Sequence, residues 1–99
     1  MEKLVYEYPA GQPAIRRALI GVVSSGDLEV LLEPNAAGTS TVLVSTSVDG
    51  FGGVWQAVLN RIFADTGLPA VRLEINDSGA TPGVVRMRVE QALEEARLP

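Results

Sequence analysis

The chain has 99 residues, of which 46% are hydrophobic and 20% charged, so we expect residues 1–99 to form a single folded domain rather than a disordered or fibrous chain. Eight basic and twelve acidic residues give a net charge of −4, which excludes the basic surface that nucleic-acid binding requires. The absence of Cys and His excludes disulfides, thiolate nucleophiles and the commonest metal ligands, so we expect no metal site and no catalytic residue.

The N-terminal segment has no apolar targeting core, and no stretch is long enough to span a bilayer. We therefore expect a cytoplasmic protein that makes no contact with a membrane. Leu4, Tyr6 and Tyr8 repeat at every second position, which predicts a strand with one buried face that ends at Pro9.

Residues 17–23 and 28–33 are two apolar runs on either side of "SSGD", a pattern that predicts a β-hairpin. Its two-residue loop would be Ser25 and Gly26, with Gly26 free to adopt a positive φ. Ser25 is then simply a turn residue, or an exposed hydroxyl suited to covalent modification. Asp27 either hydrogen-bonds within the turn or lies beside a modified serine and helps an enzyme to recognise it.

A further strand is expected over residues 41–48, with Val42, Val44, Thr46 and Val48 on one face. An amphipathic helix follows and ends near Gly67. Its apolar face would consist of Val54, Trp55, Val58, Leu59, Ile62 and Phe63.

Residues 70–76 return to strict alternation and predict a strand with Val71, Leu73 and Ile75 inward. Thr81 is a suitable N-cap for a second helix that starts with Pro82. The apolar stripe of this helix would be Val85, Val89, Ala92, Leu93 and Ala96. Together the elements predict an α+β domain, with a mixed β-sheet of about five strands and two helices packed on one face.

Other patterns have simpler explanations. The stretch "NDSGATPG" before the second helix either binds an anion with its backbone N–H groups or is an ordinary helix-starting loop. Tyr6, Trp55 and Phe63 are scattered, so we interpret them as packing residues. A group of acidic residues near the end of the last helix is interpreted as a solvated face, namely Glu90, Glu94 and Glu95.

Five stretches, in order and over essentially the whole length, resemble the acyl carrier (delta) subunit of biotin-independent bacterial malonate decarboxylase: "PAGQPA", "RALIGVVSSGDLEVLLE", "TSVDG", "WQAVLNRIF" and "DSGATPGVVRMRVEQALEEA". The resemblance implies that Ser25 carries 2'-(5''-phosphoribosyl)-3'-dephospho-CoA, covalently attached through a phosphodiester. Ser24, where the family pattern often has Gly, offers a second hydroxyl. In the helical acyl carriers the modified serine lies in an Asp-Ser-Leu motif at a helix start, so Ser78 of "DSG" in this strand-rich chain is interpreted as a decoy.

The resemblance further implies a non-catalytic subunit that carries acetyl and malonyl thioesters. Its implied partners are the transferase and decarboxylase subunits of malonate decarboxylase, and the transferase that attaches the prosthetic group. Three alternatives remain open: a small interaction or regulatory subunit without a covalent cofactor, the related carrier of citrate lyase, and a stand-alone enzyme that uses Asp27 with Glu29.

Overall fold

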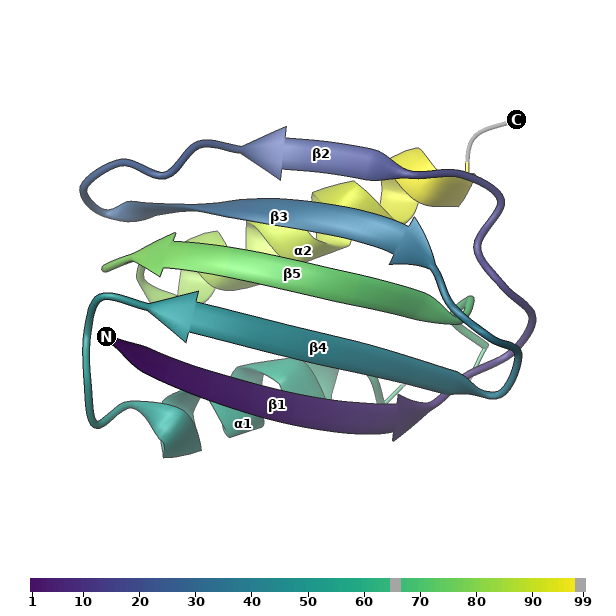
Figure 1. Ribbon diagram of the computed structural model, residues 1–99, viewed down its shortest axis with the longest axis horizontal. Helices are drawn as coiled ribbons and strands as arrows, with labels where there is room; N and C mark the ends of the chain where they lie inside the picture. The colour runs from purple at the N-terminus through teal and green to yellow at the C-terminus, as the bar shows by residue number, and fades with distance from the viewer. Residues whose placement is uncertain (65–66, 98–99) are drawn as a thin grey trace.

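A computed structural model of the chain describes residues 1–64 and 67–97 (Figure 1). Its elements in chain order are β1 (Glu2–Pro9), β2 (Ala18–Gly21), β3 (Asp27–Pro34), β4 (Thr39–Thr46), α1 (Gly52–Ile62), β5 (Val71–Ser78) and α2 (Pro82–Arg97).

The strands form one mixed sheet with the order β1-β4-β5-β3-β2. β4 and β5 are parallel, because α1 carries the chain back to the end of the sheet from which β4 started. The other three pairs of neighbouring strands are antiparallel. The predicted α+β class, with a mixed sheet of five strands and two helices, is confirmed.

Both helices lie on one face of the sheet (Figure 1). α2 packs against β2 and β3, and α1 packs beside α2 and under β1, where the Tyr6 hydroxyl donates to the Gly52 carbonyl oxygen at 3.0 Å. The predicted stripe of α2 is buried as expected. Facing it are fully or almost fully buried strand residues, Leu28, Val30, Leu32, Val42, Val44, Val71, Leu73 and Ile75. Each such aliphatic side chain contributes about 1.5–3 kcal/mol of transfer free energy, so this layer forms the core of the protein.

The hairpin differs from its prediction, because β2 ends at Gly21 rather than continuing to Val23. The connection to β3 therefore comprises residues 22–26, not two residues. Gly21 has φ +81°, outside the range of a strand, and a Cβ atom there would lie 2.2 Å from the Leu28 carbonyl oxygen. The strand therefore ends at a residue whose positive φ and close contact with the neighbouring backbone are both possible only for glycine.

The predicted end of the first helix near Gly67 is also wrong, since α1 ends at Ile62. The next residue, Phe63, leaves the helix and stacks on Tyr8 of β1, with ring centroids 4.8 Å apart. Tertiary packing thus fixes the end of α1 before the glycine and proline that suggested a later end. Residues 65 and 66, which the predicted helix included, lie outside the described residues.

Across residues 1–64 and 67–97, neither helix combines the length and the apolar character needed to cross a membrane.

We expect Gly21→Ala to destabilise the protein more than Gly26→Ala. Both glycines have a positive φ, so each substitution costs about 1–2 kcal/mol through the backbone, but a Cβ at Gly26 would meet no atom within 4 Å. The contact with Leu28 should add roughly 1–3 kcal/mol for Gly21→Ala. Urea unfolding of both variants measures the difference, and equal free energies of unfolding would contradict the close approach at Gly21.

Candidate functional site

Ser25 occupies a β-turn at the tip of the β2–β3 connection. The Asp27 N–H donates to the Ser24 carbonyl oxygen at 2.9 Å and closes the turn around Ser25 and Gly26. Gly26 has φ +78°, the positive value that the third residue of a type II turn requires. The role predicted for Gly26 is therefore confirmed, although the connection is longer than predicted. All of residues 22–26 are exposed, so both candidate hydroxyls, of Ser24 and Ser25, face solvent.

The C-terminal side of this turn is fixed to the sheet. The Gly26 N–H donates to the carbonyl oxygen of Ser78, the last residue of β5, at 2.7 Å. The next residue, Asp27, begins β3 and is the register partner of Ser78. Ser25 is thus exposed, but the next residue in the chain is hydrogen-bonded to the end of β5, the central strand of the sheet.

Asp27 is held by an arginine from the second helix. Arg88 on α2 donates Nε to Oδ1 at 3.2 Å and Nη2 to Oδ2 at 2.9 Å, and the Leu28 N–H donates to Oδ1 at 2.7 Å. Hydrogen bonding to Arg88, and secondly to the Leu28 N–H, lowers the pKa of Asp27 below its ordinary value, while partial burial opposes the shift. An arginine–carboxylate pair with two hydrogen bonds restricts orientation as well as distance, so Arg88 holds Asp27, the last residue of the turn, in place.

Gly21 is part of the same arrangement. A Cβ atom on Gly21 would lie 3.5 Å from Arg88 Nε, an ordinary contact distance, so Gly21 lies directly beside the guanidinium. The sequence does not predict the role of Arg88, because its partner depends on the strand order. The available signal was its position three residues after Val85 and four before Ala92, at the edge of the apolar stripe.

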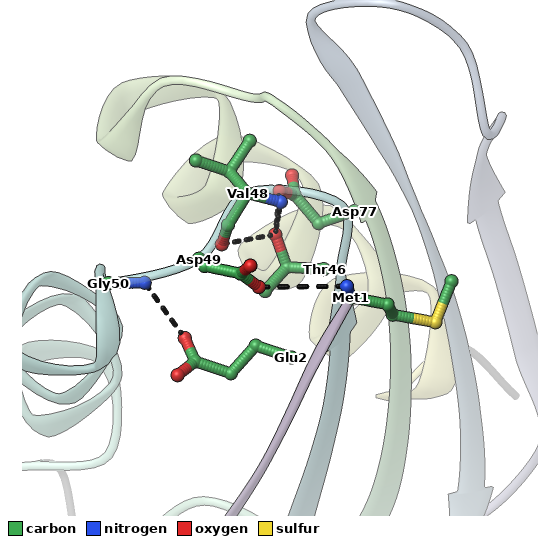
Figure 2. A network of polar contacts seen from close by, with 7 residues as sticks. All are labelled: Met1, Glu2, Thr46, Val48, Asp49, Gly50 and Asp77. Carbon is green, nitrogen blue, oxygen red and sulfur yellow. Dashed lines mark hydrogen bonds and ion pairs between the residues drawn. The ribbon is translucent and has the colours of Figure 1, made fainter.

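Of the two interpretations of residues 76–83, an anion-binding loop or an ordinary helix-starting loop, the contacts of Asp77 favour the second. The Asp77 carboxylate accepts the N–H groups of Gly79 and Ala80 at 3.1 and 3.0 Å, and also the Thr46 hydroxyl at 2.9 Å. Thr46 in turn binds the backbone of Val48, as Figure 2 shows. The loop therefore supplies its own anion, which leaves these N–H groups no capacity for another.

The remaining candidates have structural partners. Thr81 caps α2 as predicted, through the Val84 N–H at 3.3 Å. Glu29 accepts from Asn76 at 3.0 Å, whereas Asp27 binds Arg88, so the two carboxylates of the enzyme alternative already have separate partners. Within residues 1–64 and 67–97, no three acidic side chains gather in a way that could hold a metal ion.

The aromatic and acidic groups also behave largely as interpreted. Trp55 and Phe63 are only 6% and 4% exposed, which confirms their role in packing. Glu90 and Glu94 are exposed, and Glu90 pairs with Arg86 at 2.8 Å on the surface of α2.

Comparison with known proteins identifies the family. The family model described as "Malonate decarboxylase delta subunit (MdcD)" matches residues 15–96. The chain belongs to the malonate decarboxylase delta subunit family. The resemblance inferred from the sequence is therefore confirmed, and the matched region contains the whole Ser25 turn together with Asp27 and Arg88.

Similar proteins extend over nearly the entire chain. The malonate decarboxylase acyl carrier protein of Pseudomonas aeruginosa (strain UCBPP-PA14) is 59% identical over 96 residues, which are 97% of each chain. That of Azotobacter vinelandii (strain DJ / ATCC BAA-1303) is 57% identical over 95 residues, 96% of each chain. The fold matches a chain in the crystal structure of a Pseudomonas malonate decarboxylase hetero-tetramer in complex with malonate. The match has a TM-score of 0.94 and 53% sequence identity, and it covers 97% of this chain and 99% of that chain.

The Ser25 turn fits the covalent prosthetic group that a carrier in this family requires. Its hydroxyl lies on a connection whose residues 22–26 are all exposed, so the surroundings leave room for an attached group. The chain has no cysteine, so it has no thiol of its own.

We expect the ion pair between Asp27 and Arg88 to make the free energy of unfolding depend on pH. The pKa of Asp27 is lower in the folded state than the value of about 3.9 in an unfolded chain, so its contribution is present above about pH 4 and is lost as the pH falls through the folded-state pKa. Arg88→Met should therefore destabilise the protein at pH 7, and the difference from the wild type should shrink below about pH 4.

Urea unfolding between pH 7 and pH 2.5 measures this difference. Arg86→Met is the matched control, because it removes a pair with side chains 54% and 51% exposed, two residues away on the same helix, and is expected to change stability little. A destabilisation by Arg88→Met that stays constant down to pH 2.5 would show that the carboxylate of Asp27 is not the group stabilised by Arg88.

Proposed function

We propose that this chain is the acyl carrier subunit of a malonate decarboxylase, a non-catalytic domain over residues 1–99 that presents acyl groups to other subunits. The observation that carries the proposal is the exposed Ser25 hydroxyl on an anchored turn, in a chain of the delta subunit family. The proposed group is 2'-(5''-phosphoribosyl)-3'-dephospho-CoA.

Attachment would proceed at Ser25 Oγ. This oxygen would attack the phosphorus atom bonded directly to the ribose of a phosphoanhydride-activated precursor on a separate transferase. The Oγ–P bond forms as the P–O bond to the departing phosphate chain breaks, and the hydroxyl proton passes to a base of that enzyme. Gly26 and Asp27 hold one side of the turn during this step, so that the hydroxyl is presented at a fixed distance from the sheet.

The bound group would supply a thiol that can carry acetyl and malonyl in turn during a cycle run by the other subunits. The role of the chain in this cycle is to present the acyl group. A flexible tether keeps its end at an effective concentration of about millimolar near each partner site. The turn at Ser25 is the fixed end of that tether.

The surface beside Ser25 suits transient contact with partner subunits. Val22 and Val23 are 59% and 57% exposed on the same connection, two apolar side chains with no core to cover. We infer that the transferase and decarboxylase subunits, and the attaching transferase, recognise this tip by burying these valines.

We expect Ser25→Ala to abolish the covalent adduct, because no Oγ remains to form the phosphodiester. The chain is isolated from its native host growing on malonate, and its intact mass is measured, followed by fragmentation of the peptide that contains Ser24 and Ser25. Ser24→Ala and Ser78→Ala are the matched controls and should retain the adduct. Circular dichroism should show the same fold in all three variants, because all three positions are at least partly exposed.

Two other results would change the proposal. An adduct that Ser24→Ala removes and Ser25→Ala retains would keep the carrier function and move its site by one residue. A wild-type chain without any adduct in these cells would refute the carrier function and favour an interaction subunit.

A further inference from the structure

A pocket of about 250 Å³ opens between the N-terminal turns of α1 and α2. It lies at the carboxyl ends of the parallel strands β4 and β5, beside the Thr46–Asp77 contact drawn in Figure 2. We call it the helix-start pocket. It is lined by Thr46, Val48, Phe51, Val54, Trp55, Val58, Asp77, Gly79, Ala80, Pro82 and Val85.

The lining of the helix-start pocket is mostly apolar, and its polar side chains already have hydrogen-bond partners. Its two side chains with hydrogen-bonding oxygens, Thr46 and Asp77, bind each other at 2.9 Å, and Asp77 also accepts two backbone N–H groups. No lysine or arginine is among its lining residues. An occupant therefore gains by burying apolar surface and finds no positive side chain to pair with a negative group.

The size of the pocket selects a small occupant. Its 250 Å³ is below the range of about 300–1,000 Å³ that encloses drug-sized ligands, yet above the roughly 150 Å³ in which an apolar cavity binds benzene. The helix-start pocket thus fits the end of a slender chain, not a nucleotide.

The pocket and the Ser25 turn lie at the same end of the sheet. Gly26 binds Ser78 at the end of β5, and Asp77, the residue before Ser78, pairs with Thr46 at the end of β4. Figure 1 shows the β2–β3 tip, the ends of β4 and β5 and the start of α1 on one side of the molecule. Because β5 alone separates β3 from β4, the strand ends are about 10 Å apart across the sheet. A nucleotide extended by a pantetheine chain is much longer than this distance.

We propose that the helix-start pocket holds the acetylated thiol end of the arm attached to Ser25, and that it excludes the malonylated end. This inference rests on the proposed function, since it requires an arm on Ser25. Docking would shelter the acetyl form between turnovers, and the malonyl form would remain outside, where a decarboxylase subunit can receive it.

The discrimination follows from charge. An acetyl methyl group that enters the pocket favours docking about fourfold, the usual gain for one buried carbon. A malonyl group ends in a carboxylate, which would lose its hydration, find no positive side chain, and approach the carboxylate of Asp77. The same pocket therefore favours one acyl state of the carrier over the other.

Two readouts test the proposal without measuring turnover. Trp55 is the single tryptophan and lines the pocket, so its fluorescence reports the occupant directly. The chain has no cysteine, so a thiol reagent applied to the deacylated carrier reacts with the arm alone. Apo carrier is compared with carrier that has a mass-verified adduct on Ser25 and is prepared in the acetyl, malonyl and free-thiol forms.

We expect the acetyl form to shift the Trp55 emission to shorter wavelength and to reduce its quenching by acrylamide, relative to the apo and malonyl forms. Val54→Phe, which enlarges a 41% exposed side chain at the pocket, should remove this difference and speed thiol modification about threefold to tenfold. Val5→Phe, the same substitution at a 62% exposed position on β1 and outside the pocket lining, is the matched control and should change neither readout.

The outcomes separate this inference from the proposed function. An adduct on Ser25 with identical Trp55 emission in all forms, and with equal thiol rates in wild type and Val54→Phe, would overturn the inference alone. Equal shifts of the Trp55 emission, with equal acrylamide quenching, in the acetyl and malonyl forms would overturn the discrimination. Dimerisation that Val54→Phe abolishes, with unchanged thiol rates, would assign the pocket to a second copy of the chain. A chain that never carries an adduct on Ser25 would overturn both proposals.

Discussion

The pairing of β5 with β3 on one side and β4 on the other is the constraint on which the rest of the structure depends. It places Ser78 beside Asp27 and Asp77 beside Thr46, so the turn at Ser25, the start of α2 and the loop before α1 meet at one end of the sheet. Several of the hydrogen bonds that fix this end involve β5 directly, among them those of Ser78 with Gly26 and of Asp77 with Thr46 and Ala80. A shift in register of one residue would separate Gly26 from Ser78 and expose the buried face of β5.

The elements that the sequence predicts well are those in which local pattern and tertiary packing agree. The alternation around Val71, Leu73 and Ile75 and the stripe of α2 both survive in the structure, because each faces the same core. The predictions that fail concern boundaries. β2 stops where Gly21 approaches Leu28, and α1 stops where Phe63 meets Tyr8, and both contacts are between residues separated along the chain.

Residue patterns alone indicate Ser25 only as a turn residue, since serine and glycine are common in turns whatever their function. It was the resemblance over the whole chain that singled out Ser25 as a site of attachment. The ion pair of Arg88 with Asp27 could be predicted neither from residue patterns nor from the resemblance. It depends on the strand order, which places β3 rather than β1 or β4 next to α2. The helix-start pocket was equally hidden, since its walls come from two helices and two strand ends that are far apart in the sequence.

The two sides of the connection that carries Ser25 are held to different degrees. On one side it continues into β3, where Gly26 is bonded to the central strand and Asp27 to α2. On the other side it continues through two exposed valines into β2, an edge strand of four residues that ends at a glycine. The β3 side of the connection is therefore held by hydrogen bonds to two other elements, whereas the exposed valines stand on the side that leads to the short edge strand. A partner that displaced the valines would change the direction in which Ser25 points before it disturbed the core.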